Sequence, residues 1–421
     1  MPLAPALAGL RTRIPAINAA LFASLFFFLP AHVAPVYALS GLILLLSLAE
    51  GRLAEKWALL KADPLFWVFQ AFFWITPLSL LWTADLETGQ RTVGRYAFFL
   101  ISPLYLTVAR RELAPRCIAA FLAGCAFAEA LAYYNWLQMT AFPEWPRGIR
   151  VRKELEDTGP FVDHILYAPI LAWAGYLAAR EALRGPVARR LGFALLAAAT
   201  LGNLTFSGGR AGQLAGLVLL ALLVFQQLAG RPVRAFAVAL ALTGGLATLA
   251  YQGNDYFQSR VDRALAEAAA RHDDTETSIA QRLRFLENSA RLVAEHPLLG
   301  VGAGDFGDEY ARMQARHAPD RITTNNPHNQ YLFTLATTGA VGGAVLLLTY
   351  LPPILWRRRA DDLAPLRVAL VVFIGVCSLF EDYLWRSNTS LLYVLFGVLL
   401  LGRRSLGPAT DGRQAAANRA E

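Results

Sequence analysis

The chain has 421 residues, of which 56% are hydrophobic and 17% are charged, whereas soluble domains carry about a quarter charged residues. Its formal net charge of +8 comes almost wholly from arginine, and the apolar residues form repeated blocks of about 16–22 residues, the length that spans a hydrocarbon core. This composition excludes a soluble globular protein, and it attributes the positive charge to membrane topology rather than to nucleic-acid binding. The three cysteines, Cys117, Cys125 and Cys377, all lie in apolar blocks, so neither a disulfide nor a cysteine metal site is expected.

Twelve apolar blocks are predicted to be transmembrane helices. The first block follows Arg11 and Arg13 and has some likeness to a signal peptide, but a second block follows at once, so an uncleaved span is expected. The predicted spans are residues 14–30, 35–49, 65–83, 95–109, 116–139, 164–180, 189–206, 211–229, 234–252, 329–352, 366–384 and 388–402.

Basic residues in the short loops predict the orientation of these spans. One set of alternate loops collects most of them, including Arg110, Arg111 and Arg116, whereas the other set holds far fewer. The alternation persists across all the predicted spans. It places both termini in the cytoplasm and the long polar insert on the outer side.

The sequence therefore predicts an all-α polytopic membrane protein in four parts. A nine-helix transmembrane region covers residues 1–252, and a helical insert on the outer side covers 253–327. A three-helix transmembrane region covers 328–404, and a polar, Ala-rich cytoplasmic tail at 405–421 is expected to be disordered.

Two predicted outer loops in the first half of the chain carry candidate site residues. Asp85-Leu86-Glu87 spaces two carboxylates as in some metal-dependent membrane enzymes, but a single such pair is more often a solvated turn. The histidines show no ligand spacing, so no metal is expected. The loop from Thr140 to Asp163 carries Trp145 and a basic run from Arg147 to Lys153, which either docks phosphorylated sugars or is an ordinary interfacial loop.

The stretch Ser207-Gly208-Gly209-Arg210-Ala211-Gly212 opens the eighth span on the outer side. Glycines before a helix leave backbone N–H groups uncovered, the helix N-terminus adds partial positive charge, and Arg210 adds a full one. This combination favours a phosphate site. A tight turn with an arginine that snorkels to the interface is the alternative.

Helices are predicted over three parts of the insert. They run from Tyr256 to Arg271, from a capping-box spacing at Ser278 to Glu295, and from Asp305 to Arg316, with a glycine-rich turn at residues 298–304.

The helical period places the arginines of the middle insert helix on different faces. An apolar stripe of Ile279, Leu283, Leu286, Ala290 and Val293 has Arg282 beside it. Arg284, Asn288, Arg291 and Glu295 lie on the opposite face, which is expected to be solvated. Arg282 is therefore favoured over Arg284 as the arginine directed toward the membrane-facing side.

The stretch from Thr323 to Leu332 closes the insert and opens the tenth span. Asn, Pro and Asn residues around His328 favour a turn at a helix start, with Asn329 as a supporting residue. An imidazole titrates near neutral pH and can take a proton from a hydroxyl, so His328 is either a general base or a residue that fills the turn. Glu381 and Asp382, at the outer end of the eleventh span, could orient His328 or pair with an arginine.

An anion-binding helix start, an arginine and a potential base thus converge on the outer side. In a membrane protein this set suits a lipid pyrophosphate whose tail stays in the bilayer, with arginines stabilising the charge that builds on the leaving group.

The ordered motifs resemble the O-antigen ligase/polymerase superfamily. They are Ser207–Arg210, then Arg282 followed by His296-Pro297-Leu298-Leu299-Gly300-Val301-Gly302-Ala303-Gly304, then Pro327-His328-Asn329-Gln330-Tyr331-Leu332. Gly209, where relatives often have serine, and Leu286, where they often have tryptophan, depart from the pattern.

The resemblance implies a glycosyltransferase of a bacterial inner membrane with a periplasmic active site and neither metal nor cofactor. Its donor would be an undecaprenyl-pyrophosphate-linked O-antigen glycan, and its acceptor would be lipid A-core. The protein would also contact the surrounding membrane lipids. His328 would be the base, and Arg210 and Arg282 would hold the pyrophosphate.

Two other readings stay open. An O-antigen polymerase or a protein O-oligosaccharyltransferase would use the same chemistry on another acceptor. A lipid-linked glycan flippase would need polar groups near the bilayer midplane, where Gln70 and Glu129 are the clearest of few.

Overall fold

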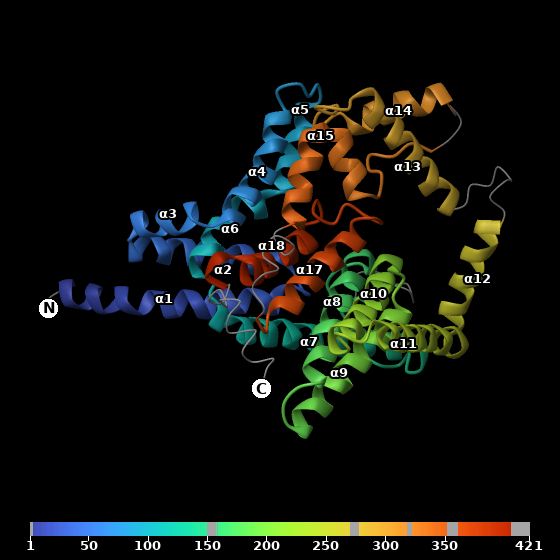
Figure 1. Ribbon diagram of the computed structural model, residues 1–421, viewed down its shortest axis with the longest axis horizontal. Helices are drawn as coiled ribbons and strands as arrows, with labels where there is room; N and C mark the ends of the chain where they lie inside the picture. The colour runs from blue at the N-terminus through green and yellow to red at the C-terminus, as the bar shows by residue number, and fades with distance from the viewer. Residues whose placement is uncertain are drawn as a thin grey trace.

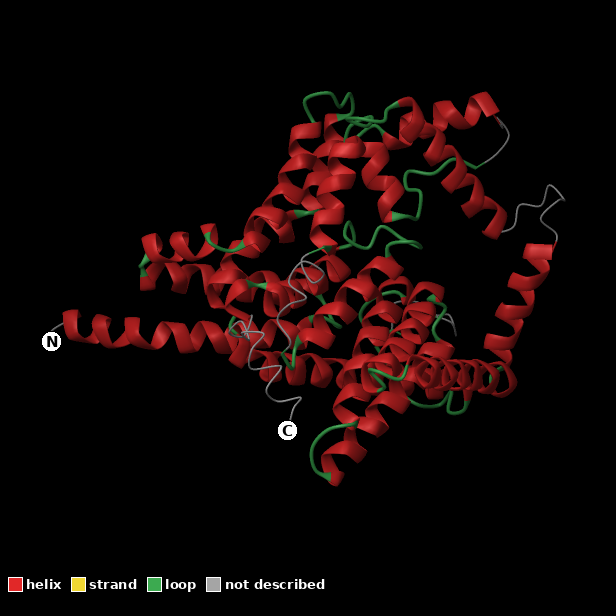
Figure 2. Cartoon of the chain, in the orientation of Figure 1, coloured by secondary structure: helices red, strands yellow, loops and turns green. Residues whose placement is uncertain are grey.

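The computed structural model describes residues 3–149, 157, 159–269, 278–317, 322–351 and 361–405, and within them the chain is helical without a strand (Figure 2). Each of the twelve predicted apolar blocks coincides with a helix (Figure 1). These helices are α1 (Leu3–Phe28), α2 (Val33–Glu50), α4 (Pro64–Ser79), α6 (Ala97–Val108), α7 (Ala114–Thr140), α8 (His164–Ala182), α9 (Val187–Phe206), α10 (Arg210–Gln227), α11 (Pro232–Gly253), α15 (Gln330–Tyr350), α17 (Ala364–Cys377) and α18 (Ser387–Leu401).

Fewer of these helices meet the length and composition of a complete membrane span. Among the described residues, α2, α7 with its preceding turn, α10, α11 and α15 are long and apolar enough to cross a membrane. A sixth span results if α4 and the short α3 (Leu53–Lys61), which meet at 85°, form one broken span. The helices α17 and α18 are apolar but shorter. The chain therefore has the helices of a polytopic membrane protein, and the predicted number of twelve spans exceeds what they show.

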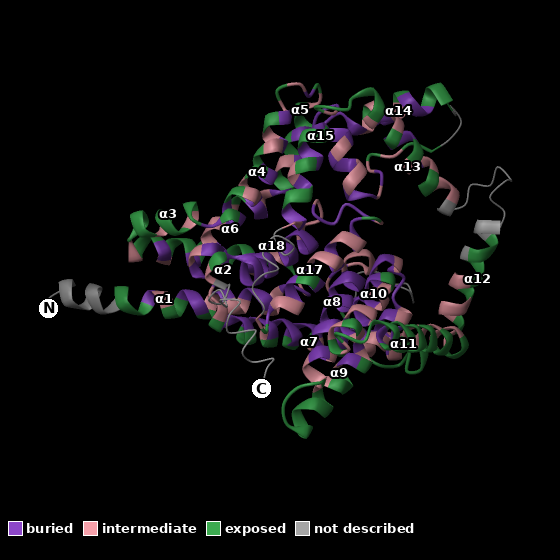
Figure 3. Cartoon of the chain, viewed as in Figure 1, coloured by how far each residue is buried: buried purple, intermediate pink, exposed green. Residues whose placement is uncertain are grey.

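Helix α18 lies at the centre of the transmembrane bundle and is buried from Asn388 to Leu401 (Figure 3). The ring of Phe396 packs edge-on against Phe26 of α1, Phe121 of α7 and Trp173 of α8, at centroid distances of 5.0, 5.2 and 5.3 Å. Because three helices hold α18 in this way, the loop before it, which carries Glu381 and Asp382, has a defined position.

The start of α10 packs closely against α8. A Cβ at Gly209 would lie 2.6 Å from the His164 carbonyl oxygen, and one at Gly212 would lie 2.3 Å from the Ala168 carbonyl carbon. Only glycine permits this approach of two backbones. The glycines before and after Arg210 thus position the arginine by close helix packing.

The insert forms the three predicted helices: α12 (Asp255–Ala269), α13 (Ser278–Glu295) and α14 (Phe306–His317). Helices α13 and α14 lie beside α15, and α12 continues from the end of α11 (Figure 1). The other short elements are α5 (Leu86–Arg95) and the 3-10 turns η1 (Arg111–Leu113) and η2 (Arg403–Ser405).

The predicted faces of α13 are partly wrong. Leu283 and Ala290 of the expected apolar stripe are exposed, and the inward face carries Phe285 and Leu292 instead. Asn288, expected in water, is buried, and its amide donates to the Gln314 side chain of α14 at 2.7 Å. Helix α14 covers this face, so the Asn288 side chain is hydrogen-bonded to Gln314 instead of facing solvent as predicted.

Three expectations lie outside the described residues. They concern the helix break at residues 273–277, the basic residues Arg150, Arg152 and Lys153 of the outer loop, and all but the first residue of the tail at 405–421.

The glycine-rich turn of the insert docks onto a break in α15. Gly339 has φ 65° and ψ −164°, a conformation that is essentially limited to glycine. The amide of Val301 donates to the Ala336 carbonyl, and that of Ala340 donates to the Pro297 carbonyl, both at 2.8 Å. The segment from Pro297 to Gly304 therefore fastens the insert to the helix that begins directly after His328.

Substitution of Gly339 is expected to destabilise the protein. In Gly339→Ala, the new Cβ would lie 2.1 Å from the Leu298 carbonyl oxygen, and the backbone strain alone costs about 1–3 kcal/mol. Gly244→Ala in α11 is the matched control, because nothing lies within 4 Å of a Cβ there. Thermal unfolding in detergent should show a clear loss for the first variant, and equal midpoints would contradict the strained break.

Candidate functional site

His328 lies on a turn that its neighbours hold in place. Its φ is +53°, in the left-handed region that few residues other than glycine adopt. Its backbone N–H donates to the Asn326 side-chain oxygen at 2.5 Å, and the ring stacks against Phe285 of α13 at 6.0 Å. Asn329 accepts from the Leu332 amide and so caps α15, and its own amide donates to the Leu379 carbonyl at 3.1 Å. The predicted turn is confirmed, and Asn329 has a structural part in it.

The imidazole of His328 pairs with Glu381. Nδ1 lies 2.8 Å from Oε2 of this carboxylate, which is buried, whereas the histidine side chain is 29% exposed. An ionised carboxylate can only accept a hydrogen bond, so Nδ1 carries a proton, and in the neutral imidazole Nε2 has the lone pair. An imidazole held in this way can accept a proton from a hydroxyl.

Glu381 and Asp382 are adjacent carboxyl groups whose pKa values are shifted in opposite directions. Burial opposes ionisation of Glu381, but hydrogen bonds from Asp382 and His328 and the charge of Arg386 outweigh it and hold the pKa of Glu381 well below its usual range. Burial and then the neighbouring Glu381 carboxylate raise the pKa of Asp382 well above its usual range. Glu381 is thus the ionised partner of His328, and Asp382 keeps a proton and accepts from the Asn326 amide at 2.7 Å.

This division predicts opposite pH effects for two isosteric substitutions. The folded chain keeps the Asp382 proton, which the unfolded chain releases above about pH 4, so this residue lowers stability as the pH rises, and Asp382→Asn removes that decline. Glu381 contributes stability above its unfolded pKa and loses it as the pH falls through its depressed folded pKa, so Glu381→Gln removes a contribution that is present at neutral pH. Thermal unfolding from about pH 2 to about pH 8 covers both slopes, since the Glu381 slope lies below about pH 4 and the Asp382 slope above it. Parallel curves for the wild type and both variants would contradict the assignment.

Four arginines converge on one cavity beside this pair. The cavity has a volume of about 230 Å³, and Arg210 of α10 and Arg282 of α13 both line it, as the sequence suggested. Glu381 lines it too, whereas His328 contacts it through Glu381. The remaining residues that line it are His164, Ile165, Gly208, Gly209, Ala211, Arg260, Arg263, Phe380 and Tyr383. A cavity with this many guanidinium groups is suited to a multiply charged phosphate ligand.

Several residues of this cavity were not predicted from the sequence. Arg260 and Arg263 lie one turn apart on α12, and His164 begins α8, with its Nδ1 3.5 Å from Asp157. Arg260 and Arg263 are three residues apart, and this spacing indicates that they share one face of the helix. The sequence therefore contained a sign that they could act together. Nothing in the local pattern around His164 indicated a position opposite residue 381.

Other candidate residues are placed elsewhere. Arg284 does not line the cavity; it is half-buried on α13 and near Tyr310. Asp85 caps α5 by accepting from the Thr88 amide at 3.0 Å, and the exposed Glu87 pairs with Arg91. Both carboxylates therefore have partners within their own turn and helix, which agrees with the solvated turn rather than a metal site.

Comparison with known proteins identifies a family for the central part of the chain. Residues 193–347 match the family model described as O-antigen ligase. A search of curated proteins found no match. The matched segment runs from α9 to α15 and holds three of the residues at or beside the arginine cavity, namely Arg210, Arg282 and His328. Residues 193–347 of this chain are therefore similar to the O-antigen ligase family.

Proposed function

We propose that this protein transfers a glycan from undecaprenyl pyrophosphate to lipid A-core at the periplasmic face of a bacterial inner membrane. The observation that carries this proposal is the placement of the His328–Glu381 pair beside a cavity lined by Arg210 and Arg282. The match of residues 193–347 to the O-antigen ligase family, whose enzymes transfer lipid-linked glycans, supports it.

The residues divide the chemistry between base and leaving group. The acceptor hydroxyl oxygen forms a bond to the anomeric carbon of the glycan, and its proton moves to Nε2 of His328. The bond from that carbon to the diphosphate oxygen breaks, and the electron pair stays on the diphosphate. Glu381 holds the imidazole in position and stabilises the imidazolium that forms, as the buried carboxylate of a catalytic triad does.

Arg210 and Arg282 stabilise the negative charge that builds on the departing diphosphate. Guanidinium groups bind phosphate in bidentate geometry and are always charged, so they supply this stabilisation without a metal ion. Purified protein treated with EDTA should therefore retain its activity, and loss of activity that added Mg²⁺ restores would contradict a metal-independent mechanism.

A reconstituted assay tests the reaction and its acceptor together. Purified protein in liposomes receives a glycan on undecaprenyl pyrophosphate, with lipid A-core, a second lipid-linked glycan and a serine-containing pilin-like protein as rival acceptors. Transfer to lipid A-core supports the ligase. Transfer to the second glycan or to the protein would instead indicate the polymerase or the protein O-oligosaccharyltransferase. Movement of the glycan lipid across the bilayer without transfer would indicate a flippase.

The proposed topology has twelve spans, cytoplasmic termini and a periplasmic insert. The alternation of basic loops supports it, and the helices of the structure coincide with the predicted blocks. Single cysteines on α13 and in the loop between α8 and α9, in a chain without its natural cysteines, should react with a membrane-impermeant reagent from opposite sides. Labelling of both from one side would contradict this arrangement.

A further inference from the structure

A second cavity that several arginines line lies at the other end of α8 from the arginine cavity. We call it the Arg180 pocket; its volume is about 300 Å³, and α7, α8, α9 and the segment before α17 line it. Helix α8 (Figure 1) begins with His164, which lines the arginine cavity, and reaches Arg180 after about 24 Å of helix. This length is close to the thickness of a hydrocarbon core, about 30 Å. The Arg180 pocket lies beside arginine-rich loops that the sequence predicts to be cytoplasmic.

Arg180 is buried at this pocket, although its guanidinium group is only partly paired. The residue is 4% exposed. Its Nη1 lies 3.1 Å from the Glu181 carboxylate, and its Nη2 donates to the Asp362 carbonyl at 2.7 Å. Among the described residues, no acceptor pairs with its buried Nε. An arginine that only sets the orientation of a loop can stay in water, whereas a buried donor without an acceptor costs free energy that a ligand can recover.

The charges that line the Arg180 pocket do not balance. Three arginines, Arg180, Arg184 and Arg189, line it together with Glu181 and Asp362. Glu181 pairs with both Arg180 and Arg189, and the Asp362 carboxylate pairs with an arginine outside the pocket. None of the ion pairs between described residues includes the exposed Arg184, whose charge repels that of Arg180. One negative charge between these two arginines would offset the repulsion.

The rest of the pocket wall is mainly apolar. Ile118 and Leu122 lie one turn apart on α7, and Phe193 of α9 lines the same space. Ala119 also lines it and is exposed, so the pocket opens to the outside of the bundle. The pocket therefore combines an anion-binding end with an apolar wall that faces the surroundings of the helices. This is the combination that the phosphate and the acyl chains of a phospholipid require.

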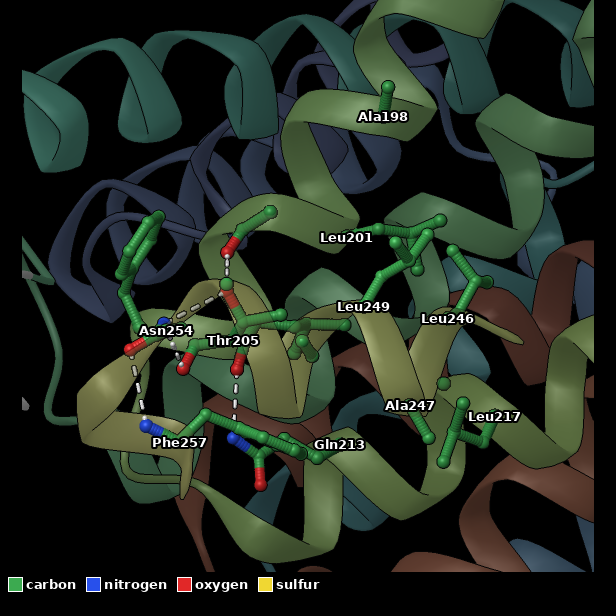
Figure 4. Close-up of a pocket in the computed structure, with 16 residues that line it drawn as sticks. Ala198, Leu201, Thr205, Gln213, Leu217, Leu246, Ala247, Leu249, Asn254 and Phe257 are labelled. Carbon is green, nitrogen blue, oxygen red and sulfur yellow. Dashed lines mark hydrogen bonds between the residues drawn. The ribbon is translucent and has the colours of Figure 1, made fainter. Parts of the chain in front are cut away.

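The apolar pocket at the other end of α9 lacks this combination. Its volume is about 420 Å³, and its walls come from α9, α10, α11 and the start of α12 (Figure 4). None of the described residues that line it is charged. The Gln213 and Asn254 amides in its wall already donate to the carbonyls of Leu204 and Thr205, at 2.9 and 3.3 Å. It therefore has no group that distinguishes one headgroup charge from another, whereas the Arg180 pocket does.

We propose that the Arg180 pocket binds an anionic phospholipid such as phosphatidylglycerol, in the leaflet opposite the arginine cavity. Arg180 and Arg184 bind its phosphate oxygens, and an acyl chain lies along Ile118 and Leu122. A phosphodiester carries one negative charge and accepts several hydrogen bonds, so it supplies both the missing acceptor and the missing charge. The inference concerns a site remote from the proposed chemistry and does not depend on glycan transfer.

Binding of defined lipids to the delipidated full chain in detergent, followed by native mass spectrometry, tests the inference. Phosphatidylglycerol should bind at least about tenfold more tightly than phosphatidylcholine with the same chains, because choline adds a positive charge beside the arginines. Glycerol 3-phosphate, which lacks acyl chains, should compete at least about tenfold less well. Equal binding of the two lipids would overturn the selection by charge. Equal competition by glycerol 3-phosphate would make this a site for a soluble phosphate and would overturn the lipid.

The role of the arginines is tested with two variants of one loop. Arg184→Gln should weaken phosphatidylglycerol binding at least about tenfold and leave phosphatidylcholine unchanged, since one charge-assisted hydrogen bond is worth that much. Arg190→Gln is the matched control. Arg190 is exposed, its Nε donates to the Ala182 carbonyl at 3.2 Å, and it does not line the pocket. Equal weakening in both variants would show attraction to the loop by charge alone and would overturn the pocket.

The role of the apolar wall is tested on α7. Ala119→Phe, which fills the pocket, should weaken phosphatidylglycerol binding at least about tenfold, the effect of losing one buried hydrocarbon contact surface. Ala130→Phe, at an exposed position of the same helix outside the pocket, should leave it unchanged. Unchanged binding in Ala119→Phe would overturn the placement of the acyl chain. Should this variant fail to fold, photoreactive phosphatidylglycerol replaces it: cross-links at residues 115–122 or 189–193 support the pocket, and cross-links confined to other segments oppose it.

Failure of this inference and failure of the proposed function can be told apart. A protein that binds phosphatidylglycerol selectively through Arg184 but transfers no glycan would refute the transferase and keep the pocket. A protein that transfers glycan but binds both lipids equally would refute the pocket and keep the transferase.

Discussion

Replacement of His328 by alanine is expected to lower the rate of glycan transfer by about 10²–10⁴-fold, the usual contribution of a positioned general base. The imidazole has the arrangement that this role needs, with Nδ1 bound to the buried Glu381 at 2.8 Å and Nε2 left to accept a proton. Because His328 does not line the arginine cavity, donor binding should persist. The effect should therefore appear in kcat, with KM for the donor changed little.

His317→Ala is the matched control for this result. His317 is also a histidine of the insert, but it is exposed at the end of α14. Transfer by this variant should equal that of the wild type. Folding of both variants is checked by thermal unfolding in detergent. A folded His328→Ala protein that retains full activity would show that the histidine only fills its turn.

Replacement of Arg282 by alanine is expected to lower kcat by about 10²–10³-fold, as removal of one preorganised group does where charge develops in the transition state. Arg282 lines the cavity with Arg210, whereas Arg284, two residues along the same helix, does not. Arg284→Ala is therefore an internal control for charge and for helix stability. It should cost far less activity.

The lysine variant separates charge from geometry. Arg282→Lys keeps the positive charge but loses the planar fork that binds two phosphate oxygens, so its activity should fall between those of the wild type and the alanine variant. Steady-state transfer at saturating donor measures the series. Equal activity of the Arg282→Ala and Arg284→Ala variants would remove Arg282 from the leaving-group site.

Local pattern in the sequence determined where the helices lie. The apolar blocks coincide with twelve helices, and the three insert helices begin and end within a few residues of their predicted bounds. The turn at His328 followed from its Asn and Pro neighbours. These features depend on residues close together in the chain, where hydrophobic period and turn chemistry act directly.

Only the tertiary structure decided which side chains meet. Glu381 lies 53 residues from His328 in the sequence and reaches it because α18 is held at the centre of the bundle. Asn288 is buried because α14 covers its face of α13, and Arg260 faces a cavity formed by α8, α10 and α13. A helical period gives the faces of a helix but does not say which neighbour covers each one, because that is set by long-range packing. The sequence by itself therefore determined the helices and three of the candidate residues, and the packing of distant helices decided the partners that complete the site.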